Sequence, residues 1–207
     1  MVTIATEAIG MLITQETGAV FLSVSGNFCV DKKASWQNVI LGRGFRAWSE
    51  VLLPTTVITD GLKTTTDELL ELWEVKCLIG SSITGSIGSN GHAANVIAAL
   101  FLATGQDLAH VVEGSMTTTL MNREADGIRV SVTIPSLMVG TIGGGTGLAT
   151  QKEALSLLGI AGGNEGKNAQ QLAEIVAAAI LAGEVSELAA LSSHTLVCAH
   201  QKLGRGK

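Results

Sequence analysis

Glycine is the residue that most constrains how this chain can fold. It accounts for 25 of 207 residues, against a usual share of roughly 7%, and many of these glycines lie in two stretches, 80–91 and 140–147. Glycine adopts backbone conformations that other residues avoid and lets a second backbone or a ligand approach closely. We therefore expect tight turns or bare, closely approached backbone at both stretches.

Composition excludes several classes of protein. A chain that is 46% hydrophobic and 15% charged is not intrinsically disordered. Its net charge of −5 and its 3% of aromatic residues argue against a nucleic-acid-binding surface. The most apolar stretches, 77–106 and 130–151, are too interrupted by polar residues and glycine to span a membrane. Few charges suggest that part of the surface is buried in an oligomer. Three dispersed cysteines suit a reducing compartment, so we expect a soluble, cytoplasmic domain.

Local patterns predict a mixture of helices and strands, which is the α+β class. Thr65 and Glu68 have the spacing of a capping box, as do Thr150 and Glu153, and each pair predicts the start of a helix. Residues 42–46 are expected to form a basic turn, and the turn residues 122–127 predict a hairpin. Helices are expected at 2–13, 34–40, 66–73, 93–103, from Thr150 through Leu158, at 169–181 and at 184–198, and strands at 19–24, 47–53, 117–121 and 128–134.

Three polar segments stand out from the apolar background. The first contains Ser25 and the run Asp31, Lys32 and Lys33. Adjacent lysines in an acidic protein concentrate positive charge, and an ammonium group there could stabilise an oxyanion. The alternative is two solvated surface lysines.

The second polar segment ends at His92 and Asn95, which share a face at the start of a predicted helix. A glycine-rich approach to a helix N-terminus favours anionic groups, although the glycines could simply allow close helix packing. Asp107 follows that helix, where a lone aspartate is usually a helix cap or a solvated loop residue.

The third polar segment, GTIGGGT at 140–146, lies between an apolar strand and a helix. It lacks the GxGxxG spacing of the Rossmann fingerprint, and it suits either close approach to a ligand or a flexible connector. Near the end, His194, Cys198 and His200 have a spacing that makes a poor zinc site, because no fourth ligand is evident. His200 could act as a general acid.

Taken together, these segments resemble the 3-hydroxy-3-methylglutaryl-CoA (HMG-CoA) reductase family, in its class I (archaeal and eukaryotic) form. The resemblance runs in order from Met1 to His200. It is carried by VSGNFCVDKK (24–33), LKTTT (62–66), GSSITGSIGSNGHAAN (80–95), ATGQD (103–107), GTIGGGT (140–146) and AALSSHTLVCAH (189–200).

The resemblance implies reduction of HMG-CoA by two NADPH to mevalonate and CoA, with no metal. It implies that Lys32 stabilises the thioester oxygen, that Asp107 hydrogen-bonds Lys32, and that His200 protonates the departing CoA thiolate. Asn95 would orient Lys32. The implied substrate-binding residues are Ser25, Asp31, Lys33 and Lys76 for the carboxylate and Lys63 and His92 for CoA, and those near the nicotinamide are Gly143, Gly144, Gly145 and Thr146.

The resemblance also implies a division of the chain. Residues 1–24 would be the C-terminal remnant of a small ferredoxin-like cofactor domain, 25–34 the catalytic-lysine loop, 35–200 the large substrate domain and 201–207 a flexible tail. The family forms homodimers or homotetramers with sites shared between subunits. Its DAMGMN-type cofactor motif and its catalytic glutamate precede the segment matched here. We therefore expect the C-terminal half of a catalytic domain, with little turnover alone. The alternative is a non-catalytic CoA-binding or oligomerisation module left by truncation.

Three features depart from the family pattern. Cys77 stands where the family usually has asparagine, and residues 192–195 read SSHT in place of AAGH. Glu187 stands where an apolar residue usually lines the hydroxymethylglutaryl pocket. A carboxylate buried there without a partner would be costly.

Overall fold

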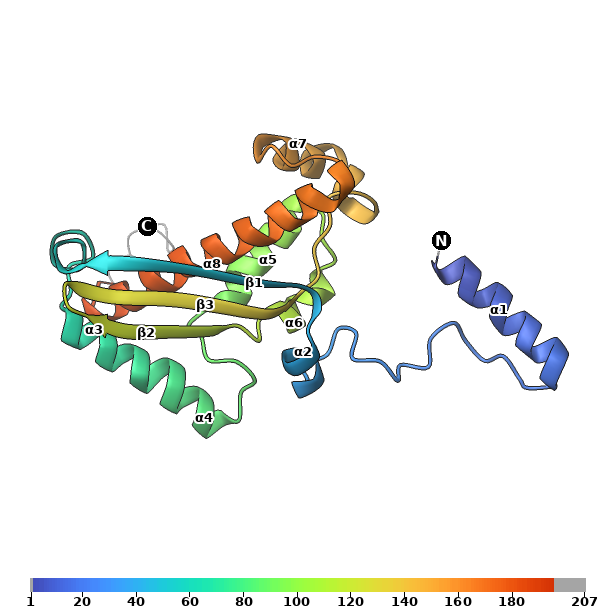
Figure 1. Ribbon diagram of the computed structural model, residues 1–207, viewed down its shortest axis with the longest axis horizontal. Coiled ribbons are helices and arrows are strands. Elements are labelled where there is room, and N and C mark those ends of the chain that lie inside the picture. The colour runs from blue at the N-terminus through green and yellow to red at the C-terminus, as the bar shows by residue number, and fades with distance from the viewer. Residues whose placement is uncertain (1, 196–207) are drawn as a thin grey trace, which may run out of the picture. The chain divides into compact units, whose positions relative to one another are not determined.

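The computed structural model describes residues 2–195 and divides the chain into two compact units, Met1–Asp31 and Lys32–Lys207. The first unit consists of helix α1 (Val2–Thr17) followed by an extended segment (Figure 1). The helix predicted at 2–13 is confirmed but runs one turn further, because the hydroxyls of Thr14 and Thr17 donate to carbonyls four residues earlier. The strand predicted at 19–24 is wrong. No strand runs beside it within the described part of this unit, so its backbone has no ladder to join.

The second unit is built on an antiparallel sheet of three strands in the order β1-β3-β2. Strand β1 is Arg43–Pro54, β2 is Thr118–Glu124 and β3 is Gly127–Leu137. The predicted hairpin is confirmed, with Glu124 paired to Gly127 across its turn. The basic turn expected at 42–46 is wrong, because Arg43 already pairs with β3. Central strand β3 is buried along most of its length, as expected for a strand covered on both edges and packed by helices.

Helices pack around this sheet, and the α+β class is confirmed. Helix α8 packs against β1 and β3, and α3 packs against β2 and α8 (Figure 1). The helices are α2 (Trp36–Leu41), α3 (Thr66–Trp73), α4 (Gly80–Thr84), α5 (Ala93–Thr104), α6 (Val111–Gly114), α7 (Ala149–Leu157) and α8 (Lys167–Ser192). Wide π-type turns occupy Val57–Gly61 and Glu74–Ile79, and 3-10 turns occupy Leu108–His110, Gly144–Gly147 and Asn164–Gly166.

The two predicted capping boxes have different outcomes. At α3 the box is complete: Glu68 N donates to Thr65 Oγ1 at 3.2 Å, and Thr65 N donates to Glu68 Oε2 at 3.1 Å. At α7 the prediction is wrong, since the helix already begins at Ala149 and the Thr150 hydroxyl donates to the neighbouring Gln151 side chain. A capping spacing forms a cap only where the chain enters the helix at that residue.

Helix α8 is a single helix where two were predicted. Gly183 lies in its interior, facing α5, and a Cβ there would lie 3.0 Å from both His92 Nε2 and Val96 Cγ2. The glycine is thus a contact surface for α5 instead of a break. By length and composition alone, the segment Asn164–Ser192 could cross a membrane. In the structure α8 packs on the sheet, as a core helix does.

We expect the Gly183→Val variant to be less stable than the parent by about 1–3 kcal/mol, because the added methyl groups overpack the contact with α5. The matched control is Ala182→Val at the exposed neighbouring position, where only helix propensity changes, by about 0.5 kcal/mol. Urea unfolding followed by circular dichroism measures both. Equal losses in the two variants would show that Gly183 is not a packing contact.

Candidate active site

Lys32 and Asp107 form an ion pair within the second unit. Lys32 Nζ lies 3.1 Å from Asp107 Oδ2, and the two side chains are 43% and 52% exposed, so a ligand can reach both. Asp107 Oδ1 also accepts a 3.0 Å hydrogen bond from Ala109 N. That backbone N–H first, and then the Lys32 ammonium, hold the pKa of Asp107 below its ordinary value. Asp107 is therefore both a helix cap and the partner of Lys32.

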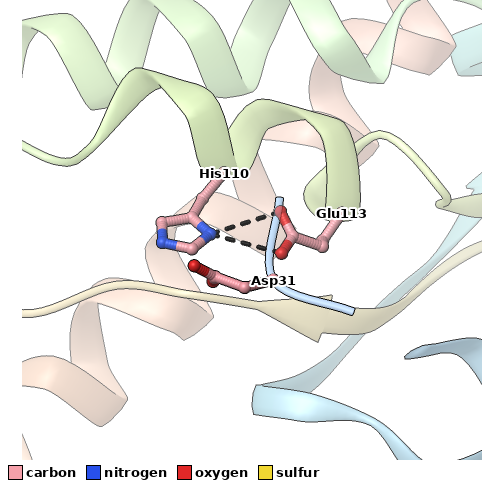
Figure 2. A group of neighbouring side chains, drawn as sticks. All are labelled: Asp31, His110 and Glu113. Atoms are coloured by element: carbon pink, nitrogen blue, oxygen red, sulfur yellow. Dashed lines mark hydrogen bonds and ion pairs between the residues drawn. The ribbon is translucent and has the colours of Figure 1, made fainter. Parts of the chain in front are cut away.

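Two residues that sequence reasoning missed lie next to this pair. Lys32 N donates to Glu113 Oε1 at 2.6 Å, and Glu113 is fully buried. The Nδ1 atom of His110 lies 3.2 and 3.3 Å from the two Glu113 oxygens (Figure 2). The signal in the sequence was weak: an acidic residue in the run VVEG also suits an exposed helix position.

The second glycine stretch packs directly against the turn that carries Asp107. A Cβ on Gly105 would lie 2.4 Å from the carbonyl carbon and oxygen of Gly145, so the two backbones are in contact. The Gln106 side chain joins the same segments: its amide donates to Gly140 O at 2.9 Å and accepts from Gly140 N at 2.8 Å. The glycines at 105 and 145 are therefore needed for backbone packing.

The remaining part of this loop is more open. Gly143 and Gly144 are exposed and have positive φ, whereas the Thr146 hydroxyl is turned inward and donates to Gly143 O at 2.6 Å. Gly143 and Thr146 line a cavity of about 260 Å³ together with Lys152. Exposed backbone at Gly143 and Gly144 thus lies near the Lys152 side chain. The role of this loop in binding a nicotinamide stays a prediction.

Lys76, the residue expected to hold a substrate carboxylate, already has a carboxylate beside it. Lys76 Nζ, in the turn Glu74–Ile79, lies 3.6 Å from Glu187 Oε1 on α8. The Glu187 side chain is 20% exposed. The departure from the family pattern at 187 is thus accompanied by a cationic partner, which offsets the cost of burying the charge.

The fully buried carboxylate of Glu184 lies close to Glu187. A ring nitrogen of His92 and carboxylate oxygens of Glu184 and Glu187 lie within 4.8 Å of one another, a spacing that could hold a metal ion. Within residues 2–195, His92 Nε2 and Glu187 Oε2 are buried without a hydrogen-bond partner. Lys76 already supplies a positive charge at the edge of this group. The fully buried Glu184 is engaged elsewhere, accepting hydrogen bonds from Gly91 N, His92 N and Thr119 Oγ1.

The other predicted site residues come from several segments of the chain. Asn95 is exposed on the first turn of α5, and its side chain makes no hydrogen bond to Lys32 among the residues that the structure describes. Lys63 is exposed with φ 60°, and the Lys33 carbonyl accepts from Asn38 Nδ2 at 2.8 Å, just before α2. Ser25 and Asp31 belong to the first unit. His200, and Cys198 of the zinc alternative, fall outside the described residues.

Comparison with known proteins defines the class. Residues 1–205 match the model of the hydroxymethylglutaryl-coenzyme A reductase family, and the chain belongs to that family.

Its relatives include the 3-hydroxy-3-methylglutaryl-coenzyme A reductases of Halobacterium salinarum (50% identical over 207 residues), Pyrococcus abyssi (48% over 209) and Methanothermobacter thermautotrophicus (46% over 206). These alignments cover 99–100% of this chain and 51% of each relative. The chain spans about half the length of the curated relatives that it matches.

The two described cysteines should differ sharply in reactivity. Cys77 is fully buried, and burial raises its pKa to about 12, so at about pH 8 only about one thiol in ten thousand is the reactive thiolate. Cys29 is exposed. We expect native iodoacetamide treatment to alkylate Cys29 and spare Cys77, as read by peptide mass spectrometry. Urea should abolish the difference, and rapid native labelling of Cys77 would show that its site opens to solvent.

Proposed function

We propose that this chain supplies the reducing site of an HMG-CoA reductase. The reaction takes one HMG-CoA, two NADPH and two protons to mevalonate, free CoA and two NADP⁺. The thioester is first reduced to the aldehyde level with loss of CoA, and the aldehyde is then reduced to the alcohol. The observation that carries the proposal is the 3.1 Å Lys32–Asp107 pair, at the positions where the family has its catalytic lysine and aspartate.

The chemistry of this pair suits both hydride transfers. Each transfer places negative charge on the carbonyl oxygen, and an ammonium group held beside that oxygen stabilises the charge as it develops. Asp107 directs the Lys32 ammonium, because the two opposite charges attract at 3.1 Å. Lys32 remains 43% exposed, which leaves its ammonium accessible to a thioester.

The other roles are assigned by resemblance and complete the proposal. Ser25, Asp31, Lys33 and Lys76 bind the substrate carboxylate end, Lys63 and His92 face CoA, and Asn95 orients Lys32 in the substrate complex. His200 protonates the CoA thiolate. The loop 143–146 lies beside the nicotinamide of NADPH, and no step needs a metal. The division at residues 24, 34 and 200 is part of the same proposal, as is a cytoplasmic location.

A second copy of this chain completes the proposed assembly, a homodimer or homotetramer with shared sites. Support comes from large apolar side chains on the surface of the second unit. Trp36, Ile40, Leu41 and Trp48 are each more than 60% exposed. Exposed apolar side chains of this size are common at protein interfaces.

The direct test measures NADPH oxidation in the presence of HMG-CoA, using the purified chain alone and mixed with the other half of the Halobacterium salinarum relative. We expect little turnover alone and clear turnover in the mixture. Lys32→Ala should lower kcat at least about a hundredfold, as loss of an oxyanion donor does. The control Lys167→Met, at an exposed position, should leave the rate unchanged.

The outcomes separate the two candidate functions. Turnover that survives Lys32→Ala would refute the assigned role of Lys32. Binding of HMG-CoA by calorimetry, with no turnover in any mixture, would instead support the non-catalytic CoA-binding module.

The Lys76–Glu187 pair generates a second prediction. If Lys76 binds the substrate carboxylate, Glu187 competes for it, and Glu187→Leu should tighten HMG-CoA binding up to about fivefold, the range expected for a partly exposed ion pair. Calorimetry with HMG-CoA and with CoA separates the effects, because CoA lacks that carboxylate and should bind equally well to both proteins. Weaker HMG-CoA binding in the variant would show that Glu187 assists the substrate.

A further inference from the structure

His110 and Glu113 are the two titratable residues next to the Lys32–Asp107 pair that the family resemblance left without a role. Glu113 lies on α6 and its side chain is 0% exposed, while the His110 side chain is 12% exposed. Buried ionisable groups are costly and persist where other groups compensate them. Their surroundings therefore indicate what they hold in place.

Glu113 fixes the backbone of Lys32. Lys32 has φ 57°, in the left-handed region that residues with a Cβ disfavour. Its backbone N–H donates to Glu113 Oε1 at 2.6 Å, from a residue 81 positions away in the sequence. A charge-assisted hydrogen bond of this kind is among the stronger ones in proteins. The direction in which the Lys32 side chain leaves the backbone thus depends on Glu113.

His110 connects the same carboxylate to Asp107. His110 Nδ1 lies 3.2 and 3.3 Å from the two Glu113 oxygens (Figure 2). An ionised carboxylate only accepts, so this contact is assigned to the tautomer that carries its hydrogen on Nδ1. The other ring nitrogen, Nε2, lies 3.8 Å from Asp107 Oδ2, which is longer than a hydrogen bond and is an ion pair only when the imidazole is protonated. The same oxygen of Asp107 is 3.1 Å from Lys32 Nζ.

These contacts bring four residues together, three of the links being hydrogen bonds or ion pairs and the fourth the 3.8 Å approach of His110 to Asp107. The links run from the Lys32 backbone to Glu113, then to His110, then to Asp107, and back to the Lys32 ammonium. We propose that His110 and Glu113 are positioning residues that hold both the backbone of Lys32 and the carboxylate that faces its amine. The effect of this positioning on hydride transfer rests on the proposed function. Its effect on the exposure of the Lys32 amine does not.

The test measures acetylation of individual lysines by a short pulse of acetic anhydride at about pH 8, where an ion-paired ammonium is protected. The reaction acylates the free amine and releases acetate, and tryptic peptides report each lysine in the same digest. Exposed Lys152 and Lys167 serve as internal references. Asp107→Asn, which removes the partner directly, sets the largest effect on Lys32.

We expect Glu113→Gln and His110→Leu each to raise the rate at Lys32 by about threefold relative to the references, within the range that partly exposed ion pairs give. His110→Gln is the conservative rescue, since its amide N–H can still donate to Glu113, and it should stay close to the parent. Thermal melting confirms that each variant is folded. If Glu113→Gln does not fold, the two His110 variants decide.

Two results would overturn the proposal. The first is an acetylation rate at Lys32 that is unchanged in His110→Leu although Asp107→Asn raises it. That result would show that the Lys32–Asp107 pair persists without His110. The second is a uniform increase at all lysines with a lower melting temperature, which would assign His110 and Glu113 a purely structural role. If Asp107→Asn itself changes nothing, the ion pair behind the proposed function fails as well.

Discussion

Two carboxylates with no exposure to solvent organise this structure, and the need to compensate them connects segments far apart in the sequence. Glu184, in the middle of α8, accepts from Gly91 N, His92 N and Thr119 Oγ1 at 2.7–2.8 Å. Glu113 accepts from the Lys32 backbone and from His110. Removal of any one donor would leave a buried carboxylate short of hydrogen-bond partners. Glu184 therefore fixes the glycine-rich segment before α5, and Glu113 fixes the segment that contains Lys32.

Glycine has two separate uses in this chain. At Gly105, Gly145 and Gly183 the absent side chain allows a backbone or a helix to approach, and a Cβ would collide with named atoms. At Gly143 and Gly144 nothing lies within 4 Å of the point that a Cβ would occupy, and φ is positive. The first group holds the Asp107 turn, the third polar segment and α8 in place. The second leaves exposed backbone on the open side of the same loop.

Local signals predicted some local features correctly and others wrongly, since the capping box at Thr150 and the turn at 42–46 did not form. The capping box at Thr65 and the hairpin between β2 and β3 are decided by residues within a few positions of each other, and both were correct. Other errors arose where distant packing decides: Gly183 has the local character of a helix break, and only its contact with α5 explains why the helix continues. Likewise, nothing near Glu113 in the sequence reveals that its partner is the backbone of a residue 81 positions earlier. Motifs named the candidate site residues, whereas the residues that contact them could be identified only from the fold.

The charge balance at Lys76 shows how a departure from a family pattern can be accommodated. An apolar residue at 187 would leave the Lys76 ammonium available to an anionic ligand. With glutamate there, the nearest carboxylate belongs to the protein, 3.6 Å away. Glu187 also lies close to the fully engaged Glu184, and like charges at short range are unfavourable unless a cation intervenes. Lys76 therefore balances the charge of the partly exposed Glu187, which lies beside the fully buried Glu184. An anion that approached the Lys76 ammonium would compete with Glu187 for it.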